Sequence, residues 1–401
     1  GGSLLQGELL RISNDSHLLA LIVHPIICDG WSIGVICEDL ASAYRAHSGK
    51  SALPAESTPG IAEFMKRQTG SGAAYWMQNL SAVTSPLDLP TDHQRTNNNI
   101  GQTANQQCRV SPELAQELKA VCGQNGISLF SALGALFCAQ LSRLAGSDAV
   151  TLSILAAGQL GDGLDRMVGQ CARWLPAQIT IPGSSTGIEL AKSAQTVVLD
   201  AYDHQDCDID SIIAQDQSHP GVRCPRVAFN LDPDPNNSHT RFDPLQAHVT
   251  TAVSVPLPFE LFLNATTDQQ GIFFDLRYDS SLFSMPTVEK WLKGYVAILQ
   301  RFAATPESPL ADLTTPPEED LQRIAVWNNT SVRYTDERCV HELFEAQVKL
   351  APDAVAVSHG AKTLTYAELN AQANRLGHHL RKIGVVPGTR VAVCLERSLD
   401  M

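Results

Sequence analysis

The chain has 401 residues, of which 44% are hydrophobic and 18% charged, a composition typical of a globular protein with two or three folding units. Its formal net charge of −13 at pH 7, with no basic patch along the sequence, argues against binding to nucleic acid or to an anionic membrane surface. The 10 cysteines are scattered without C-x-x-C spacing, so we expect reduced thiols in a cytoplasmic protein rather than a metal site or a disulfide framework.

The N-terminal region predicts two strands followed by a helix. The strands cover residues 8–12 and 17–23. The run Leu18–Val23 is apolar throughout, so we expect the second strand to be buried on both faces. This run is also far too short to span a bilayer. A helix is predicted from about Ile33 to His47, where apolar side chains recur at helical spacing. The residues between strand and helix therefore form a strand–loop–helix corner, a common place for functional side chains.

The rest of the chain predicts an α/β pattern with one clear boundary. Residues 49–112 carry weak signals apart from a short helix around Ala73–Leu80. Later helices are predicted over Pro112–Val121, Ser128–Leu144, Ile188–Tyr202 and Pro286–Ala303. Later strands are predicted over Val150–Leu155, Gln178–Ile181, Arg226–Leu231, Phe259–Ala265 and Gly271–Tyr278. Prolines and acidic residues mark a boundary at 304–338, after which a new helix–strand–helix pattern begins at Cys339 and reaches a strand at Val391–Leu395.

One motif lies on the predicted corner: Val23-His24-Pro25-Ile26-Ile27-Cys28-Asp29-Gly30-Trp31-Ser32. It resembles the active-site motif of the condensation domains of nonribosomal peptide synthetases, His-His-x-x-x-Asp-Gly, which is usually extended by Trp-Ser. The residues in register are His24, Asp29, Gly30, Trp31 and Ser32. Pro25 stands where the family has its second histidine. Because proline offers neither a proton donor nor a proton acceptor in its side chain, the mismatch predicts the loss of a catalytic group.

Further segments that resemble this family follow in the correct order. Those of the condensation domain are Tyr75-Trp76 and Leu87–Asp92 of its connector, Met167–Pro176, Phe229–Asp232 and Phe259–Phe262. Within the third of these segments, Arg173 stands where the family pattern has Asn. Leu364–Leu369 then matches the first core motif of adenylation domains, and Cys339–Phe344 resembles their first helix. Condensation followed by adenylation is the order of an elongation module, and several such segments in sequence are specific where one would be weak.

The resemblance implies an α/β fold, the two-lobed chloramphenicol-acetyltransferase-like architecture, followed by the N-terminal fragment of an adenylate-forming domain. On this interpretation residues 1–50 end the first lobe, 51–90 form a connector, 91–312 form the second lobe, 313–338 form a linker and 339–401 begin an incomplete adenylation domain. We expect the first lobe to be truncated, with its earlier motifs before residue 1. The phosphate-binding loop and the later adenylation motifs are expected after residue 401.

In the family, a carrier-bound acyl or peptidyl donor is joined to an aminoacyl acceptor, and the second histidine handles the proton of the attacking amine. The resemblance assigns the catalytic motif to His24, Asp29 and Gly30, with Pro25 in place of the second histidine. It assigns positions near the substrate tunnel to Trp31, Ser32, Gly169, Arg173 and Asn230.

Other interpretations of these residues stay open. His24 either braces the corner or, after a shift of register, takes over the catalytic role. Asp29 is expected to brace the loop rather than act as a general base. Gly30 is expected to supply a backbone conformation that other residues resist. Arg173 is either a solvated charge or a side chain that fills the tunnel.

The implied partners are the upstream and downstream peptidyl carrier domains and the rest of the synthetase, with no nucleic acid and no membrane. No cofactor and no metal is expected to bind directly. Phosphopantetheine arms belong to the carriers, and ATP and Mg²⁺ to the part of the adenylation domain that lies outside the chain. The alternative function is a catalytically silent condensation-like platform that docks carrier domains or a tailoring enzyme, which Pro25 and Arg173 favour. The adenylation motif disfavours a free-standing acyltransferase.

Overall fold

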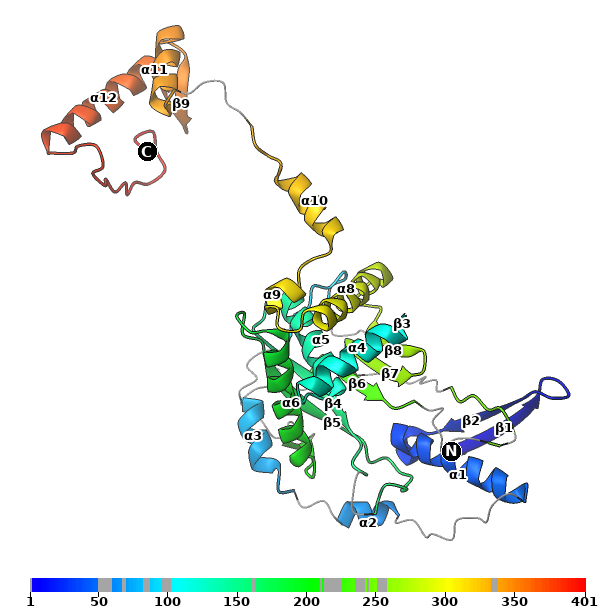
Figure 1. The fold of residues 1–401 in the computed structure, drawn as a ribbon. Coiled ribbons are helices and arrows are strands. Elements are labelled where there is room, and N and C mark those ends of the chain that lie inside the picture. The colour runs from blue at the N-terminus through cyan, green and yellow to red at the C-terminus, as the bar shows by residue number, and fades with distance from the viewer. Residues whose placement is uncertain are drawn as a thin grey trace. The chain divides into compact units, whose positions relative to one another are not determined.

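The structure is a computed structural model, and the residues that it describes are 2–49, 60–66, 70–81, 87–95, 102–159, 163–209, 211–212, 225–234, 242–243, 245–250, 258–332 and 338–401. The chain divides into two compact units, Gly1–Glu318 and Glu319–Met401. The first unit contains the motif and a six-stranded sheet (Figure 1).

A mixed six-stranded sheet is the centre of the first unit. Its strands are β3 (Thr103–Val110), β4 (Ala149–Ala156), β5 (Arg173–Thr180), β6 (Val227–Asp232), β7 (Leu261–Asp268) and β8 (Gly271–Asp279). They lie in the order β3-β8-β7-β6-β4-β5, and only the pairs β4–β6 and β6–β7 are parallel. Gly271, with φ +117°, turns the β7–β8 hairpin, and any Cβ there would lie 2.1 Å from the carbonyl oxygen of Val110.

One face of the sheet is covered by helices and forms the main core. The helices of this unit that follow the connector are α4 (Pro112–Gln124), α5 (Leu129–Ala145), α6 (Gly187–Asp203), α8 (Met285–Ala304) and the short α9 (Leu310–Leu313). Helix α5 is apolar on nearly every side and is buried over most of its length. Since side chains alternate along a strand, Asn230, Asn264 and Asp275 lie on the opposite face, away from the helices.

The N-terminal part of the first unit carries the corner that holds the motif. Strands β1 (Leu5–Arg11) and β2 (His17–Val23) form an antiparallel hairpin, and among the described residues neither pairs with any other strand. One turn of 3₁₀ helix, η1 (Pro25–Ile27), follows, and then α1 (Gly30–His47). The predicted strand–loop–helix order is confirmed. Helix α1 begins three residues earlier than predicted, because Asp29 caps it by accepting a hydrogen bond from the backbone N–H of Ser32.

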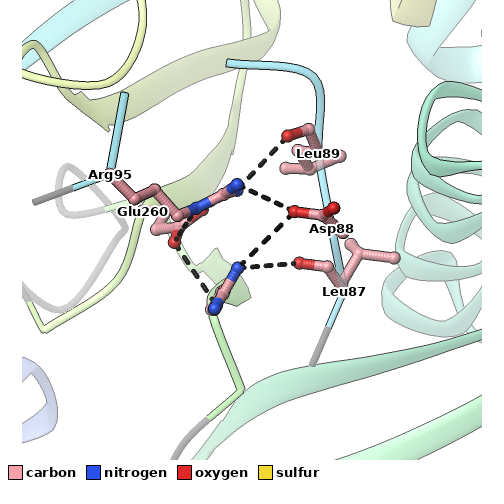
Figure 2. Close-up of polar contacts among 6 residues, drawn as sticks. Leu87, Asp88, Leu89, Arg95 and Glu260 are labelled. Carbon is pink, nitrogen blue, oxygen red and sulfur yellow. Dashed lines mark hydrogen bonds and ion pairs between the residues drawn. The ribbon is translucent and has the colours of Figure 1, made fainter. Parts of the chain in front are cut away.

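The connector joins this corner to the sheet and contains α2 (Ile61–Lys66) and α3 (Ala73–Ser81). Its last described stretch is fixed to the sheet by two arginines that share two carboxylates (Figure 2). Arg95 lies 2.8 Å from Asp88 and 3.1 Å from Glu260, the residue before β7. Arg226, the residue before β6, lies 3.4 Å from Glu260. Residues 87–95 are thereby held against the N-terminal ends of two central strands.

The second unit is small. Helix α10 (Glu318–Asn328) begins at the boundary, and α11 (Val340–Leu350), the hairpin of β9 (Val355–His359) and β10 (Lys362–Thr365), and α12 (Tyr366–Lys382) follow. Thr365 and Glu368 cap α12 reciprocally. No described residue from Glu319 to Met401 is buried. The strand predicted at Val391–Leu395 is wrong: no partner strand lies beside these residues in the described chain, and they form no regular element.

Two other expectations are corrected. Strand β2 is not buried on both faces, since Leu18, Leu19 and Ile22 are 52%, 47% and 67% exposed. The sequence predicted an interior strand from its apolar run, but in the described chain β2 has only β1 as a neighbour. Strand β5 begins at Arg173 rather than at Gln178. Pro176 is tolerated within it because β5 is an edge strand, with β4 on one side only.

No single helix of the described chain is long and apolar enough to cross a membrane. Helices α4 and α5 together satisfy the same criteria of length and composition, but the pair is bent by 104°.

Candidate functional site

His24 occupies the start of the corner and is exposed. It is the N-cap of η1, and its Nδ1 accepts a hydrogen bond of 3.1 Å from the backbone N–H of Ile26. Because Nδ1 is the acceptor, the neutral ring carries its hydrogen on Nε2, and Nε2 has no free lone pair with which to take a proton. Pro25 is the first residue of η1, a position that proline suits because its φ is already helical. In this arrangement neither residue offers a ready general base.

The carboxylate of Asp29 is the centre of the corner. It is 8% exposed. Its Oδ1 accepts from the backbone N–H of Ser32 at 2.9 Å, and its Oδ2 accepts from the backbone N–H groups of Cys171 and Ala172, both at 3.0 Å. Asp29 thus caps α1 and at the same time holds the segment that leads into β5. The family resemblance implied that His24 and Asp29 face residues 168–176 across a cleft. In the structure, residues 29–32 instead contact residues 165–172 directly through hydrogen bonds.

Ser32 and Trp31 complete this contact. The Ser32 hydroxyl is fully buried, lies 2.7 Å from Asp29 Oδ1 and 2.9 Å from the carbonyl oxygen of Gly169, and accepts from the Gly169 backbone N–H at 3.0 Å. Its single hydrogen donates to one of the two oxygens. The Trp31 indole N–H donates to the carbonyl oxygen of Asp165 at 2.8 Å. Ser32 and Gly169, both of which the resemblance assigns to the substrate tunnel, therefore meet, and Trp31 contacts the same segment at Asp165.

Gly30 does not have the special backbone conformation that was expected. It is the first residue of α1, its φ is not in the left-handed region, and a Cβ built on it would meet nothing within 4 Å. The glycine that needs its conformation is Gly158, with φ +74°, where a Cβ would lie 2.6 Å from the carbonyl oxygen of Cys171.

Gln159 is the residue of this site that sequence reasoning missed. It is fully buried, and its Nε2 lies 3.3 Å from Asp29 Oδ1 and 3.4 Å from the Ser32 hydroxyl. Its Oε1 has no hydrogen-bond partner, the one such buried side-chain atom in the part of the chain that the structure describes. A polar amide directly after an apolar strand and a glycine is a weak signal, and only the fold brings it to Asp29.

The thiols at the corner are not set up as nucleophiles. Burial, and then the negative charge of Asp29, raise the pKa of Cys28 to about 11. The same two causes, in the same order, raise the pKa of Cys171 to about 12, although Arg173 opposes them. Both thiols therefore stay protonated at neutral pH, and the thiolate is the reactive form. Within the described ranges no group of three or more His, Cys, Asp or Glu side chains could hold a metal ion.

Arg173 and Asn230 lie on the sheet, outside the hydrogen-bond network of Asp29. The Arg173 Nη1 donates to the carbonyl oxygen of Cys207 at 2.8 Å, and its guanidinium carbon lies 5.9 Å from the ring centre of Phe64. Asn230 is 9% exposed and belongs to a separate network on β6 and β7. Its Nδ2 donates to Asp232 at 2.7 Å and to Asn264 at 3.1 Å.

Comparisons with known proteins agree with this fold. The family model described as "Condensation domain" matches residues 1–325, and the one described as "AMP-binding enzyme" matches residues 344–401. Malpinin synthetase of Mortierella alpina is 30% identical over 419 residues, and the alignment covers 100% of this chain. Surfactin synthase subunit 2 of Bacillus subtilis (strain 168) is 30% identical over 416 residues, and the alignment covers 99% of this chain. The chain spans only 5% and 11% of their lengths.

Solved structures of the same fold include the first condensation domain of the CDA synthetase, with a TM-score of 0.66 at 19% identity, covering 77% of this chain and 69% of that one. The X-domain from teicoplanin biosynthesis, solved in complex with OxyB, has a TM-score of 0.62 at 20% identity, and the match covers 77% of this chain and 72% of that one. A four-domain nonribosomal peptide synthetase bound to AMP and glycine has a TM-score of 0.65 at 18% identity, and the match covers 96% of this chain and 31% of that one. The chain therefore belongs to the condensation-domain family of nonribosomal peptide synthetases, and its condensation region is followed by the start of an AMP-binding enzyme region.

Proposed function

We propose that this chain is the condensation region of a synthetase module whose task is amide-bond formation between a carrier-bound acyl or peptidyl donor and an aminoacyl acceptor, and that it performs this step slowly. The observation that carries the proposal is Pro25, which occupies the second-histidine position on an otherwise complete corner. The proposed divisions are those expected from the sequence: 1–50 and 91–312 for the two lobes, 51–90 for the connector, 313–338 for the linker and 339–401 for the adenylation region.

The chemistry explains why one side chain matters. The acceptor amine must lose a proton as it attacks the donor thioester, and a neutral imidazole near physiological pH is suited to take or steer that proton. Pro25 cannot do so, and the His24 ring already uses Nδ1 to accept from Ile26. Holding two reactants together accelerates the reaction without a base, so residual activity is expected. Loss of a positioned acid–base group costs roughly 10²–10⁴ in rate.

In this proposal the catalytic motif retains His24, Asp29 and Gly30, with Asp29 acting through the loop that it holds. The residues beside the substrate path are Trp31, Ser32, Gly169, Arg173 and Asn230. The partners are the upstream and downstream carrier domains, which bring donor and acceptor on phosphopantetheine arms. ATP-dependent activation of the acceptor belongs to the complete AMP-binding region, and no described residue of 339–401 is assigned to ATP or Mg²⁺. The cytoplasm is the proposed location.

The test is a single-turnover condensation assay between loaded donor and acceptor carrier domains, in the synthetase module that contains this chain. Pro25→His should raise the rate, while Pro25→Ala, which frees the backbone but supplies no imidazole, should not. His24→Ala in the native background should change little. Full native activity that collapses in His24→Ala would overturn the proposal and give the catalytic role to His24.

A second candidate function is a silent platform that docks carrier domains or a tailoring enzyme. Two observations favour it: the absence of a base at Pro25, and the similarity of the fold to the X-domain that was solved in complex with OxyB. This candidate predicts that Pro25→His gains no activity, while deletion of residues 1–325 from the synthetase removes binding of a carrier domain or a tailoring enzyme. A deletion that leaves binding unchanged would exclude it.

A further inference from the structure

Arg173 directly follows two of the three residues whose backbone N–H groups bind Asp29. Cys171 and Ala172 donate to the carboxylate, and Arg173 then begins β5. Its guanidinium donates to the carbonyl oxygen of Cys207 and lies over the ring of Phe64 in α2. The side chain is partly buried. Arg173 therefore has fixed contacts. It is not a freely solvated charge, which was one of the two interpretations that the sequence allowed.

The turn that receives Arg173 also receives the connector. Trp76, which is 1% exposed, donates its indole N–H to the carbonyl oxygen of His204 at 2.8 Å. Tyr75 stacks on the His204 ring at 4.0 Å between ring centres. The Gly72 backbone N–H donates to the carboxylate of Asp206 at 3.2 Å. Residues 204–207, which follow α6, are thus the place where the connector docks on the second lobe.

We propose that Arg173 is a positioning residue: it braces the start of β5 between Phe64 and the turn 204–207, and so holds the Cys171 and Ala172 amides in place for Asp29. A guanidinium suits this role because it reaches across to the Cys207 carbonyl and presents a flat face to an aromatic ring. Carboxylates on either side of Cys207, those of Asp206 and Asp208, favour a cation there. Asparagine, the family's residue, is too short to span these contacts.

The consequence is a link between the connector and the catalytic corner. The same turn anchors α3 through Trp76 and the Asp29-binding loop through Arg173, so a displacement of the connector is transmitted to the motif. The relevance of this link to turnover rests on the proposed function. The substitution Arg173→Asn, which would open the tunnel if Arg173 obstructed it, is instead expected to loosen the corner.

The test is hydrogen exchange on the full chain, which does not depend on turnover. In Arg173→Asn, peptides covering 168–172 should exchange at least about tenfold faster than in the native chain, while those of α5 keep their protection. Arg173→Lys, which keeps a charged donor, should restore most of the protection. Arg109→Gln is the matched control, because it removes the same charge from an ion pair with Asp268, on the strands at the other edge of the sheet.

Unchanged exchange at 168–172 in Arg173→Asn would overturn the inference. If that variant loses protection in α5 as well, the variant Phe64→Leu is measured instead. Faster exchange at 168–172 in Phe64→Leu supports the proposed role of Arg173, and unchanged exchange there refutes it. Activity is measured separately in the Pro25→His background. There Arg173→Asn should lower kcat and leave the KM for the carriers unchanged. Faster exchange without any gain from Pro25→His would retain the brace and reject the proposed function.

Discussion

The buried carboxylate of Asp29 is stabilised by hydrogen bonds rather than by a cation. No Lys or Arg side chain forms a salt bridge with it among the residues that the structure describes, and its donors are two hydroxyl or amide side chains and three backbone N–H groups. Hydrogen bonds to an ionised group are about twice as strong as those between neutral groups. These contacts fix the corner to the loop 169–172, which is the geometry that a bracing aspartate requires.

Replacing Asp29 by Asn tests that role. The amide has a single acceptor oxygen, so its NH₂ group must face either the Ser32 N–H or the N–H groups of Cys171 and Ala172, and at least one donor loses its partner. We expect a loss of about 1–3 kcal/mol in the free energy of unfolding, measured by urea titration with tryptophan fluorescence. Asp15→Asn, the same change at an exposed hairpin turn, should cost less than about 0.5 kcal/mol. Equal effects in the two variants would contradict the bracing role.

At the scale of elements, helix α8 depends on a residue far away in the sequence. Ser284 and Thr287 lie at its N-terminus, and Ser284, the N-cap residue, makes no side-chain hydrogen bond that caps the backbone. Asp92, from the end of the connector, accepts from the Ser284 backbone N–H at 2.7 Å and from the Thr287 hydroxyl at 2.9 Å. A carboxylate at this position also complements the positive end of the helix dipole. Asp92 therefore joins the connector to the largest helix of the core.

Asp92→Ala should lower the free energy of unfolding by about 1 kcal/mol at pH 7. Burial opposes the charge on Asp92, but its hydrogen bonds with Ser284 and Thr287 outweigh that effect and lower its pKa below the ordinary value. A depressed pKa stabilises the folded state above the unfolded-state pKa, and the contribution is lost as the pH falls through the folded-state value. The difference from the native chain should therefore shrink as the pH falls below about 3.9, the ordinary value of an aspartate, and vanish only below the folded-state pKa, where Asp92 is protonated in both states.

Urea titrations of both proteins between pH 7 and pH 3 measure this difference. The control is Glu289→Ala, which removes a half-exposed carboxylate of the same helix that pairs with Lys293, and it should cost less than about 0.5 kcal/mol. A difference that stays constant over this pH range would show that the charge of Asp92 does not act on α8.

The sequence predicted most elements of the first unit because their patterns are local. Helix α5 has a capping serine, seventeen residues of helix and a C-terminal glycine, all visible in one window. Strand β3 was missed because its sequence is polar: Gln107 and Arg109 face away from the core, and pairing with β8 forms it. In the site, the family resemblance placed Trp31, Ser32 and Gly169 near one tunnel, but it did not give the hydrogen bonds that join them to their partners. Gln159 and the partners of Arg173 depend on tertiary packing, which no local pattern encodes.

At the scale of the whole molecule, the two units differ in how much they bury. The first has a continuous core between sheet and helices, while no described residue of Glu319–Met401 is buried. A folding unit with little buried apolar surface is marginally stable on its own. Among the described residues of the first unit, the hairpin of β1 and β2 carries many exposed apolar side chains close together. Its exposed large apolar side chains are Leu5, Leu9, Leu10, Leu18, Leu19, Leu21 and Ile22.

This hairpin should make the chain self-associate. Exposed apolar side chains lie on both faces of this two-stranded sheet, whose outer edges have no partner strand in the part of the chain that the structure describes, and such surfaces bind one another in water. Size-exclusion chromatography with light scattering should therefore show oligomers of the native chain. The double substitution Leu9→Lys and Leu19→Glu places opposite charges at directly paired positions, which keeps the hairpin compatible with its register while removing apolar surface.

We expect that double variant to shift the midpoint of dissociation to at least about tenfold higher protein concentration. Leu199→Lys is the control: Leu199 is 55% exposed, but it is an isolated side chain on α6, and single exposed apolar residues do not drive association. A native chain that stays monomeric at all concentrations, or a Leu199→Lys variant that dissociates as readily as the hairpin variant, would show that the hairpin is not the surface through which the chain associates.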